Sequence, residues 1–318
     1  MSRDPIQLQK GLSLRQFHAA YGSEEQCEAA VRAWRWPNGF VCPHCSSTDH
    51  AIVGKRRLHE CHDCGRQTSL KAGTVFENTL LPLTVWFQGM YLLTQAKNSI
   101  SGLELARQLG VRPDTASLMR HKLMSVMVER EASRKLEGRV EMDDAVLGGQ
   151  KHLDEGGKRG RNGPNKTPFV VAVETSDAGH PRRLMLHVVK THDGENIEAM
   201  ARAHLAPTAR VVSDGLGCFR AVTRAGCAHE PMVAAKLGWS EQLPCFRWVN
   251  TVLGNIKTAI VGTLKSVKRR YVFRYFGEFQ YRFNRRFKLP EMLDRLACVV
   301  ARSKPRPYKL LAIADGAG

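Results

Sequence analysis

The stretch Arg247-Trp248-Val249-Asn250-Thr251-Val252-Leu253-Gly254-Asn255-Ile256-Lys257 decides how the rest of the chain is interpreted. Its apolar residues Val249, Leu253 and Ile256 recur at spacings of three and four, a pattern typical of one face of an amphipathic helix. Asn250 and Lys257 are seven residues apart, close to two turns, so they share a stripe of that helix. An amide oxygen and a cation on one stripe of a helix indicate an active site only where acidic side chains face them.

Two upstream aspartates are candidates to face that stripe. Asp143 lies in the short apolar run 140–147, and Asp214 follows the run 209–213. Taken singly, a helix asparagine is mostly solvated and an Asp-Gly pair mostly marks a turn. The hypothesis of an active site therefore rests on Asp143, Asp214 and Asn250 together.

The bulk composition narrows the class of protein. The chain has 318 residues, which suggests about two domains. No apolar run approaches the roughly 20 residues that span a bilayer, and the first residues lack the apolar core of a signal peptide. We therefore expect a soluble protein of the bacterial cytoplasm or nucleoid without membrane contact. A net charge of +18 favours nucleic acid as partner, although a protein can be basic for solubility alone.

Four of the nine cysteines have metal-ligand spacing. Cys42 and Cys45 form one Cys-x-x-Cys pair, and Cys61 and Cys64 form a second. This spacing is typical of a zinc ribbon, in which four thiolates hold a structural Zn²⁺ and leave no open position for substrate. The other cysteines are scattered and are expected to be buried thiols.

A helix, a glycine turn and a second helix follow the ribbon. Ser101 and Glu104 suit the start of the first helix, Gly110 a turn, and Pro113 the start of the second. This pattern predicts a helix-turn-helix whose second helix exposes Arg120 and Lys122 to double-stranded DNA. An ordinary helical hairpin is the alternative.

Beyond residue 136 the pattern changes from helices to strands. Three strands come first, and helices then alternate with strands, which predicts a mixed sheet with helices on its faces. This is the order of an RNase H-like α/β fold. The predicted domains are a helix with the zinc ribbon, a helix-turn-helix-like region, an RNase H-like catalytic domain with basic C-terminal helices, and a flexible tail: 1–75, 76–135, 136–300 and 301–318.

Two basic segments are further candidates for DNA contact. The glycine-rich segment 148–166 contains Lys158, Arg159 and Arg161, and it is otherwise interpretable as a plain linker. The segment 264–290 contains Arg269, Arg270, Arg285 and Arg286 among aromatic residues that suit a core better than base stacking.

The chain resembles the transposases of the IS1595 insertion-sequence family, with their zinc-ribbon and ISXO2-like segments. The matching motifs extend from about residue 14 to residue 300: Trp36-Pro37-Asn38-Gly39-Phe40-Val41-Cys42-Pro43-His44-Cys45, Cys61-His62-Asp63-Cys64, Leu81-Pro82-Leu83-Thr84-Val85-Trp86-Phe87, the Asp143 strand with Gly148-Gly149, Ser213-Asp214-Gly215, Trp248-Val249-Asn250-Thr251 with Lys257, and Tyr281-Arg282-Phe283-Asn284-Arg285-Arg286-Phe287.

The resemblance implies binding of terminal inverted repeats, metal-dependent DNA cleavage and strand transfer, with Asp143, Asp214 and a third residue as metal ligands and Lys257 assisting. The third position is Asn250 where the general pattern has glutamate, and Asp144 stands where many relatives have glutamate. Two Mg²⁺ or Mn²⁺ ions bound by oxygen ligands suit phosphoryl transfer on DNA. We also expect a homo-oligomer on DNA that joins the element ends to a target.

Two other interpretations stay open. A catalytically inactive or domesticated relative would only bind DNA through its ribbon and helix-turn-helix. A non-transposing RNase H-like nuclease would not need residues 1–130. For the third ligand, Glu241 and Asn255 compete with Asn250.

Overall fold

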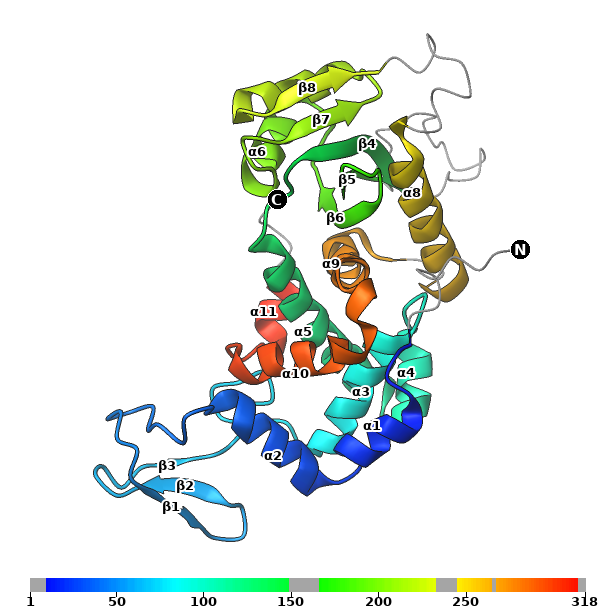
Figure 1. Ribbon diagram of the computed structural model, residues 1–318. Coiled ribbons are helices and arrows are strands. Elements are labelled where there is room, and N and C mark those ends of the chain that lie inside the picture. Colours follow the sequence, from blue (N-terminus) through cyan, green and yellow to red (C-terminus); the bar gives the residue numbers. More distant parts are fainter. Residues whose placement is uncertain (1–9, 149–165, 233–244, 265–266, 314–318) are drawn as a thin grey trace. The chain divides into compact units, whose positions relative to one another are not determined.

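The computed structural model describes residues 10–148, 166–232, 245–264 and 267–313 (Figure 1). The chain forms two compact units. Unit 1 comprises Met1–Val126 with Phe287–Ile313, and unit 2 comprises Met127–Arg286. Over the described ranges, no helix combines the length and apolar character that a membrane crossing requires.

Unit 1 combines helices with a small antiparallel sheet in the order β1-β2-β3. Helix α10 packs against α2 and α3, which brings the C-terminal helices to the N-terminal ones. The elements are α1 (Leu14–Tyr21), α2 (Glu24–Arg35), β1 (His50–Val53), β2 (Leu58–Cys61), β3 (Gln67–Thr68), α3 (Leu83–Gln95), α4 (Gly102–Leu109), the first part of α5 (Pro113–Ala132), α10 (Met292–Arg302) and α11 (Tyr308–Ile313).

The helix predicted ahead of the zinc ribbon is two helices, α1 and α2. The side chain of Ser23 accepts a hydrogen bond from the backbone N–H of Gln26 at 3.3 Å, and Ser23 itself is extended. This N-cap starts α2 after a break at Gly22. The single helix predicted ahead of the zinc ribbon is therefore wrong.

Unit 2 contains a mixed five-stranded sheet in the order β6-β5-β4-β7-β8. Strands β4 and β6 are each antiparallel to β5, whereas β4, β7 and β8 are parallel. The strands are β4 (Arg139–Leu147), β5 (Thr167–Thr175), β6 (Pro181–Val188), β7 (Arg210–Ser213) and β8 (Ala228–Pro231). A mixed sheet with helices was predicted, and the sheet is confirmed.

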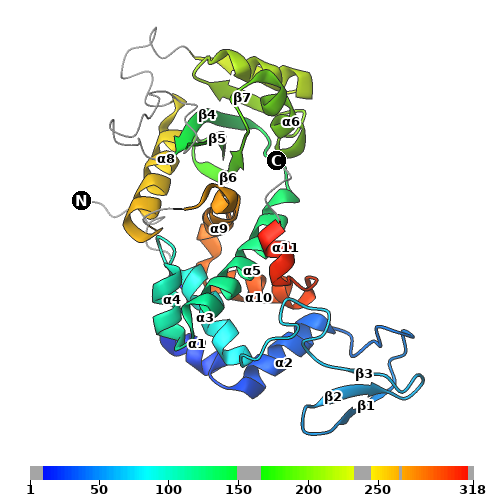
Figure 2. The ribbon, with the colours of Figure 1, turned by 180° about the vertical axis from the view of Figure 1, so that it is seen from behind.

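Each face of this sheet is covered by helices (Figures 1 and 2). One core contains Val140 and Met142 of β4 together with α6 (Gly194–His204) and the 3-10 helix η3 (Gly217–Ala225). The other core contains Val249, Val252 and Ile256 of α8 (Arg247–Ala259) together with residues of β5, β6 and α9 (Val272–Asn284). Strand β5 is buried along its whole length because both cores use it.

The outer edge of β6 is hydrogen-bonded to side chains of α9. Gln280 accepts the backbone N–H of Leu186 at 2.8 Å, and Asn284 accepts that of Leu184 at 2.7 Å. Asn284 also donates to the carbonyl of Leu184 at 3.0 Å. Since these amides are four residues apart on a helix, they reach alternate residues of the strand as a neighbouring strand would.

Two predicted limits differ from the structure. Residues 287–300, assigned to the catalytic domain, group with unit 1 because α10 packs on α2 and α3. The tail expected to be flexible contains helix α11, where Leu311 is buried.

Candidate active site

Three carboxylates lie together at one end of the sheet of unit 2. Asp143, Asp144 and Asp214 each place an oxygen within 4.8 Å of the others. The parallel pairing of β4 with β7 ends at Met142 and Ser213, so Asp143 and Asp214 are the next residues on two adjacent strands. The order of the strands reverses here, since the chain continues from β4 to β5 on one side and returns to β7 on the other. Ligand sites of open α/β sheets lie at such positions.

Local hydrogen bonds fix two of these carboxylates. Asp143 Oδ1 accepts the backbone N–H of Asp144 at 2.8 Å, and Asp214 Oδ1 accepts that of Leu216 at 3.1 Å. Gly215 has a φ of 84°, a left-handed conformation that glycine adopts without strain, and it turns the chain away after Asp214. The strand end therefore holds Asp214 beside Asp143.

The charge of the cluster fits a divalent cation. Carboxylates this close repel one another unless a proton or a metal ion neutralises them. Oxygen donors are the ligands that Mg²⁺ and Mn²⁺ prefer. Asp143, Asp144 and Asp214 are thus the described residues that could hold such an ion. Sequence reasoning identified Asp143 and Asp214 but gave no role to Asp144.

His192 supports Asp144 from the α6 side. Its Nδ1 lies 3.7 Å from Asp144 Oδ2, and its Nε2 lies 3.2 Å from the carbonyl oxygen of Phe169. The two side chains are only 8% and 3% exposed. Burial, followed by the charge of Asp144, raises the pKa of the nearby Cys218 thiol, so Cys218 stays neutral. The doublet Asp143-Asp144 was the only sequence signal for this arrangement.

Helix α8 lies on the face of β4 to which Asp143 belongs. Ala145 and Leu147 pack in the same core as α8, and side chains two residues apart on a strand share a face. Asn250 and Lys257 lie on the exposed side of α8, flanking its buried stripe. Their roles stay predictions. Glu241, the competing carboxylate, lies outside the described residues.

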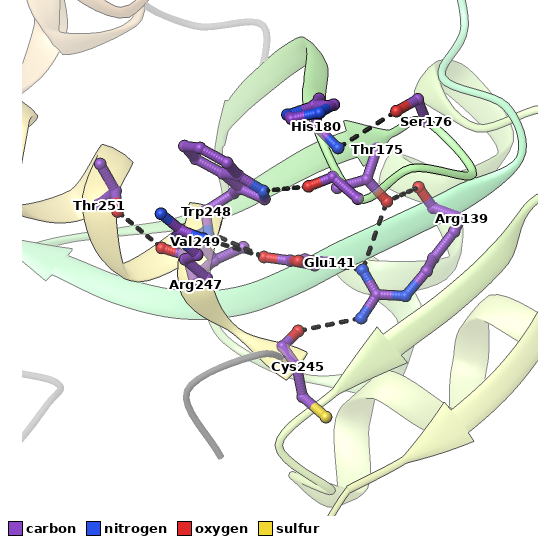
Figure 3. Close-up of polar contacts among 11 residues, drawn as sticks. Arg139, Glu141, Thr175, Ser176, His180, Cys245, Arg247, Trp248, Val249 and Thr251 are labelled. Atoms are coloured by element: carbon purple, nitrogen blue, oxygen red, sulfur yellow. Dashed lines mark hydrogen bonds and ion pairs between the residues drawn. The ribbon is translucent and has the colours of Figure 1, made fainter. Parts of the chain in front are cut away.

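A buried carboxylate ties the start of α8 to β4 (Figure 3). Glu141 Oε2 accepts the backbone N–H groups of Trp248 at 2.9 Å and Val249 at 3.2 Å. Glu141 Oε1 pairs with Arg139 at 3.0 Å, and Arg139 also donates to the carbonyl of Cys245 at 3.2 Å. The negative charge suits the positive end of the helix dipole. Glu141 is two residues before Asp143, so the helix is fixed close to the acidic cluster.

The four predicted zinc ligands converge in unit 1. Cys42, Cys45, Cys61 and Cys64 place their sulfur atoms within 4.8 Å of one another. Two tight turns position them: the N–H of Ser46 donates to the carbonyl of Cys42, and that of Gly65 to the carbonyl of Cys61, both at 2.9 Å. A hydrogen bond from the backbone of His44 lowers the pKa of Cys42 to about 7, which favours the thiolate. The cluster fits a structural zinc ion.

The predicted exposure of Arg120 and Lys122 is wrong. Arg120 is 3% exposed and donates to the hydroxyl of Ser99 at 2.8 Å. Lys122 is half-buried over the ring of Trp86, and burial lowers its pKa. The helix–glycine–helix geometry exists, with Gly110 at a φ of 65°, but α5 turns these two cations inward.

The remaining predicted DNA contacts divide into three groups. Arg269 and Arg270 are exposed. Arg285 instead pairs with Glu131, and Arg286 donates to backbone carbonyls of Pro181 and Phe283. Burial lowers the pKa of Arg286 to about 10. Both side chains therefore hold unit 2 together, whereas Lys158, Arg159 and Arg161 lie outside the described residues.

Comparison with known proteins assigns the class of both segments. Residues 135–284, which contain the acidic cluster, match the family described as the ISXO2-like transposase domain. Residues 22–67, which contain the four cysteines, match the family described as the transposase zinc-ribbon domain. Both matches are thus to domains of IS1595-type transposases, one in each of two separate segments of the chain.

One relative is described by its place in a transposable element. Over 127 residues the chain is 30% identical to a protein of Halobacterium salinarum described as an uncharacterized protein in transposable element ISH50. The match covers 38% of this chain and 41% of that relative, so the chain spans less than half of its length.

Proposed function

We propose that the chain is a DNA transposase whose unit 2 is an RNase H-like catalytic domain. The observation that carries this proposal is the cluster of Asp143, Asp144 and Asp214 where the parallel pairing of β4 with β7 ends and the strand order reverses. The sheet order β6-β5-β4-β7-β8 agrees with three antiparallel strands followed by two parallel ones, as the RNase H-like order requires.

The chemistry proposed is metal-dependent cleavage and joining of DNA. Bound Mg²⁺ or Mn²⁺ would activate the attacking oxygen and neutralise the leaving one. Asp143, Asp144 and Asp214 would hold the ions, while His192 keeps Asp144 in place. Asn250 would add an amide oxygen, and Lys257 would neutralise phosphate charge. The proposed DNA substrates are the terminal inverted repeats of an insertion sequence and a target duplex, bound by a homo-oligomer.

The N-terminal region would recognise the element ends. The zinc ribbon supplies a rigid scaffold with exposed Arg56 and Arg66, and α4–α5 form a helix-turn-helix-like pair. Since Arg120 and Lys122 are turned inward, the exposed start of α5, with Arg112 and Ser117, is the part available to DNA.

Variants of the acidic cluster test the catalytic proposal. Asp143→Ala and Asp214→Ala should each reduce Mg²⁺-dependent cleavage of an element-end duplex by more than 10³-fold, on the order of an essential catalytic group. Binding of the duplex should stay within a few-fold. Asp177→Ala, in the exposed turn between β5 and β6, is the control and should cleave normally. Near-native cleavage by either cluster variant would contradict the proposal, and binding without cleavage by the unaltered chain would indicate a DNA-binding relative instead.

A further inference from the structure

A cavity of about 570 Å³ lies beside the outer edge of β6 in unit 2. Its walls come from the end of α5, the strand itself, His204 at the end of α6, and the segment from Arg269 to Asn284. The acidic cluster does not line it. The cavity is therefore a separate feature of the same unit.

Cations line this cavity. Arg134, Arg183, Lys190, Arg269 and Arg270 contribute five positive charges. Glu131 is the acidic lining residue, and it already pairs with Arg285, which lies outside the lining. Among the residues that the structure describes, Arg134, Lys190, Arg269 and Arg270 form no ion pair. Burial, followed by the charge of Arg134, lowers the pKa of Arg183. Like charges held together in this way favour an anionic ligand.

The neutral polar groups of the cavity are already engaged. Gln280 and Asn284 hydrogen-bond the backbone of β6, and His187 lies 3.1 Å from His204 through ring nitrogens. Burial lowers the pKa of His187 to about 4, so the ring is neutral at pH 7. The groups left to recognise a ligand are therefore guanidinium and ammonium donors, which bind phosphate oxygens well.

The cavity runs along β6 from Arg183 to Lys190, so it includes the row of the sheet that contains Asp144. Strands β4 and β6 run in the same direction because each is antiparallel to β5. Asp144 pairs with Val170, and Val170 pairs with His187, so these residues form one row across the sheet. Strands spaced by about 4.8 Å put His187 about 10 Å from Asp144 along that row. This distance corresponds to about three base-pair steps of 3.4 Å along the axis of a duplex.

We propose that this cavity binds the phosphodiester backbone of duplex DNA a few nucleotides from the acidic cluster. The inference rests on the proposed function and adds a second DNA contact to it. Free phosphate has the same oxygen chemistry as a phosphodiester, so the test must separate the two sources.

The test introduces one negative charge inside the cavity and one beside it. Ala132→Glu places a carboxylate on a lining residue, whereas Ser133→Glu makes the same charge change on the next, exposed residue, which does not line the cavity. Affinity of the full chain for a duplex oligonucleotide of arbitrary sequence is measured by fluorescence anisotropy over a range of KCl concentrations. Isothermal titration with inorganic phosphate is the second arm.

We expect Ala132→Glu to weaken duplex binding at least tenfold and to lower the slope of log affinity against log salt by about one. Ser133→Glu should change duplex affinity less than twofold. Arg269→Ala, which removes a lining cation, should weaken duplex binding as Ala132→Glu does. Lys268→Ala, which removes a neighbouring cation that does not line the cavity, should change duplex affinity as little as Ser133→Glu does. Equal effects of the two glutamate variants would overturn the inference. So would loss of phosphate binding in Ala132→Glu with unchanged duplex affinity, because the occupant would then be a small anion.

Failure of this inference is distinguishable from failure of the proposed function. Metal-dependent cleavage with unchanged duplex binding by Ala132→Glu overturns the cavity contact alone. Duplex binding that is sensitive to Ala132→Glu, without any cleavage, overturns the catalytic proposal alone. A chain that binds no duplex contradicts both.

Discussion

Glu141 Oε2 lies 2.9 Å from the backbone nitrogen of Trp248, a residue 107 positions later in the chain. This one carboxylate joins the strand that contains Asp143 to the helix that contains Asn250. It also accepts the N–H of Val249 and forms an ion pair with Arg139, so the carboxylate contacts both helix α8 and its own strand β4 (Figure 3). The register between strand and helix therefore depends on a buried ionic contact as well as on apolar packing.

Removal of Glu141 should destabilise unit 2. Glu141→Ala leaves two helix N–H groups without their acceptor and Arg139 without its ion-pair partner, and breaking such a buried pair costs about 3 kcal/mol. Glu230→Ala breaks the exposed pair with Arg210 and should cost about 0.5 kcal/mol. Urea unfolding followed by circular dichroism measures both. Equal losses would show that the Glu141 contact does not stabilise the fold.

Asn250 should be needed for catalysis, whereas Asn255 should not. Both are exposed asparagines of α8, but only Asn250 shares a stripe with Lys257. Asn250→Ala should lower strand transfer at least 100-fold, and Asn250→Asp should restore part of it with an altered preference between Mg²⁺ and Mn²⁺. Asn255→Ala should stay near the native rate. An inactive Glu241→Ala beside an active Asn250→Ala would move the third ligand to Glu241.

The ribbon should lose its zinc when one thiolate is removed. Cys42→Ser should lower bound zinc from about one ion per chain to a small fraction, because metal binding and folding are coupled at such sites. Cys298→Ser, which changes a thiol of α10, should retain the metal. The zinc content of each protein, purified without chelator, is measured by elemental analysis. An absence of zinc in the unaltered chain would refute the assignment of the four cysteines as zinc ligands.

Acid should weaken unit 2 through His187. Its pKa falls to about 4 in the folded chain, chiefly by burial, against 6.5 for the free side chain. The unfolded chain therefore binds more protons between these values, so the stability present above pH 6.5 is lost as the pH falls towards 4. His187→Gln should flatten this part of the stability curve, and a variant of the exposed His180 should not. Urea midpoints from pH 7.5 to 4.5 give the comparison; a curve unchanged by His187→Gln would contradict it.

Sequence reasoning located features whose signals are local. The cysteine spacing placed the zinc cluster, and apolar runs placed β4 and β5 with Asp143 inside the first. The contacts of Glu141 with Trp248 and of His192 with Asp144 join distant segments, so no local pattern encodes them. Arg120 shows a further limit, because helical periodicity cannot tell which side of a helix meets solvent when α5 is buried on several sides.

The amides of Gln280 and Asn284 have a consequence for self-association. An open sheet edge is a template on which a second copy can add a strand, and repeated addition leads to aggregation. In this chain the edge of β6 is already hydrogen-bonded at the N–H and C=O of Leu184 and at the N–H of Leu186, by side chains that cannot extend the sheet. Helix α9 therefore ends the sheet on this side, and its side chains keep this edge from pairing with a strand of another molecule.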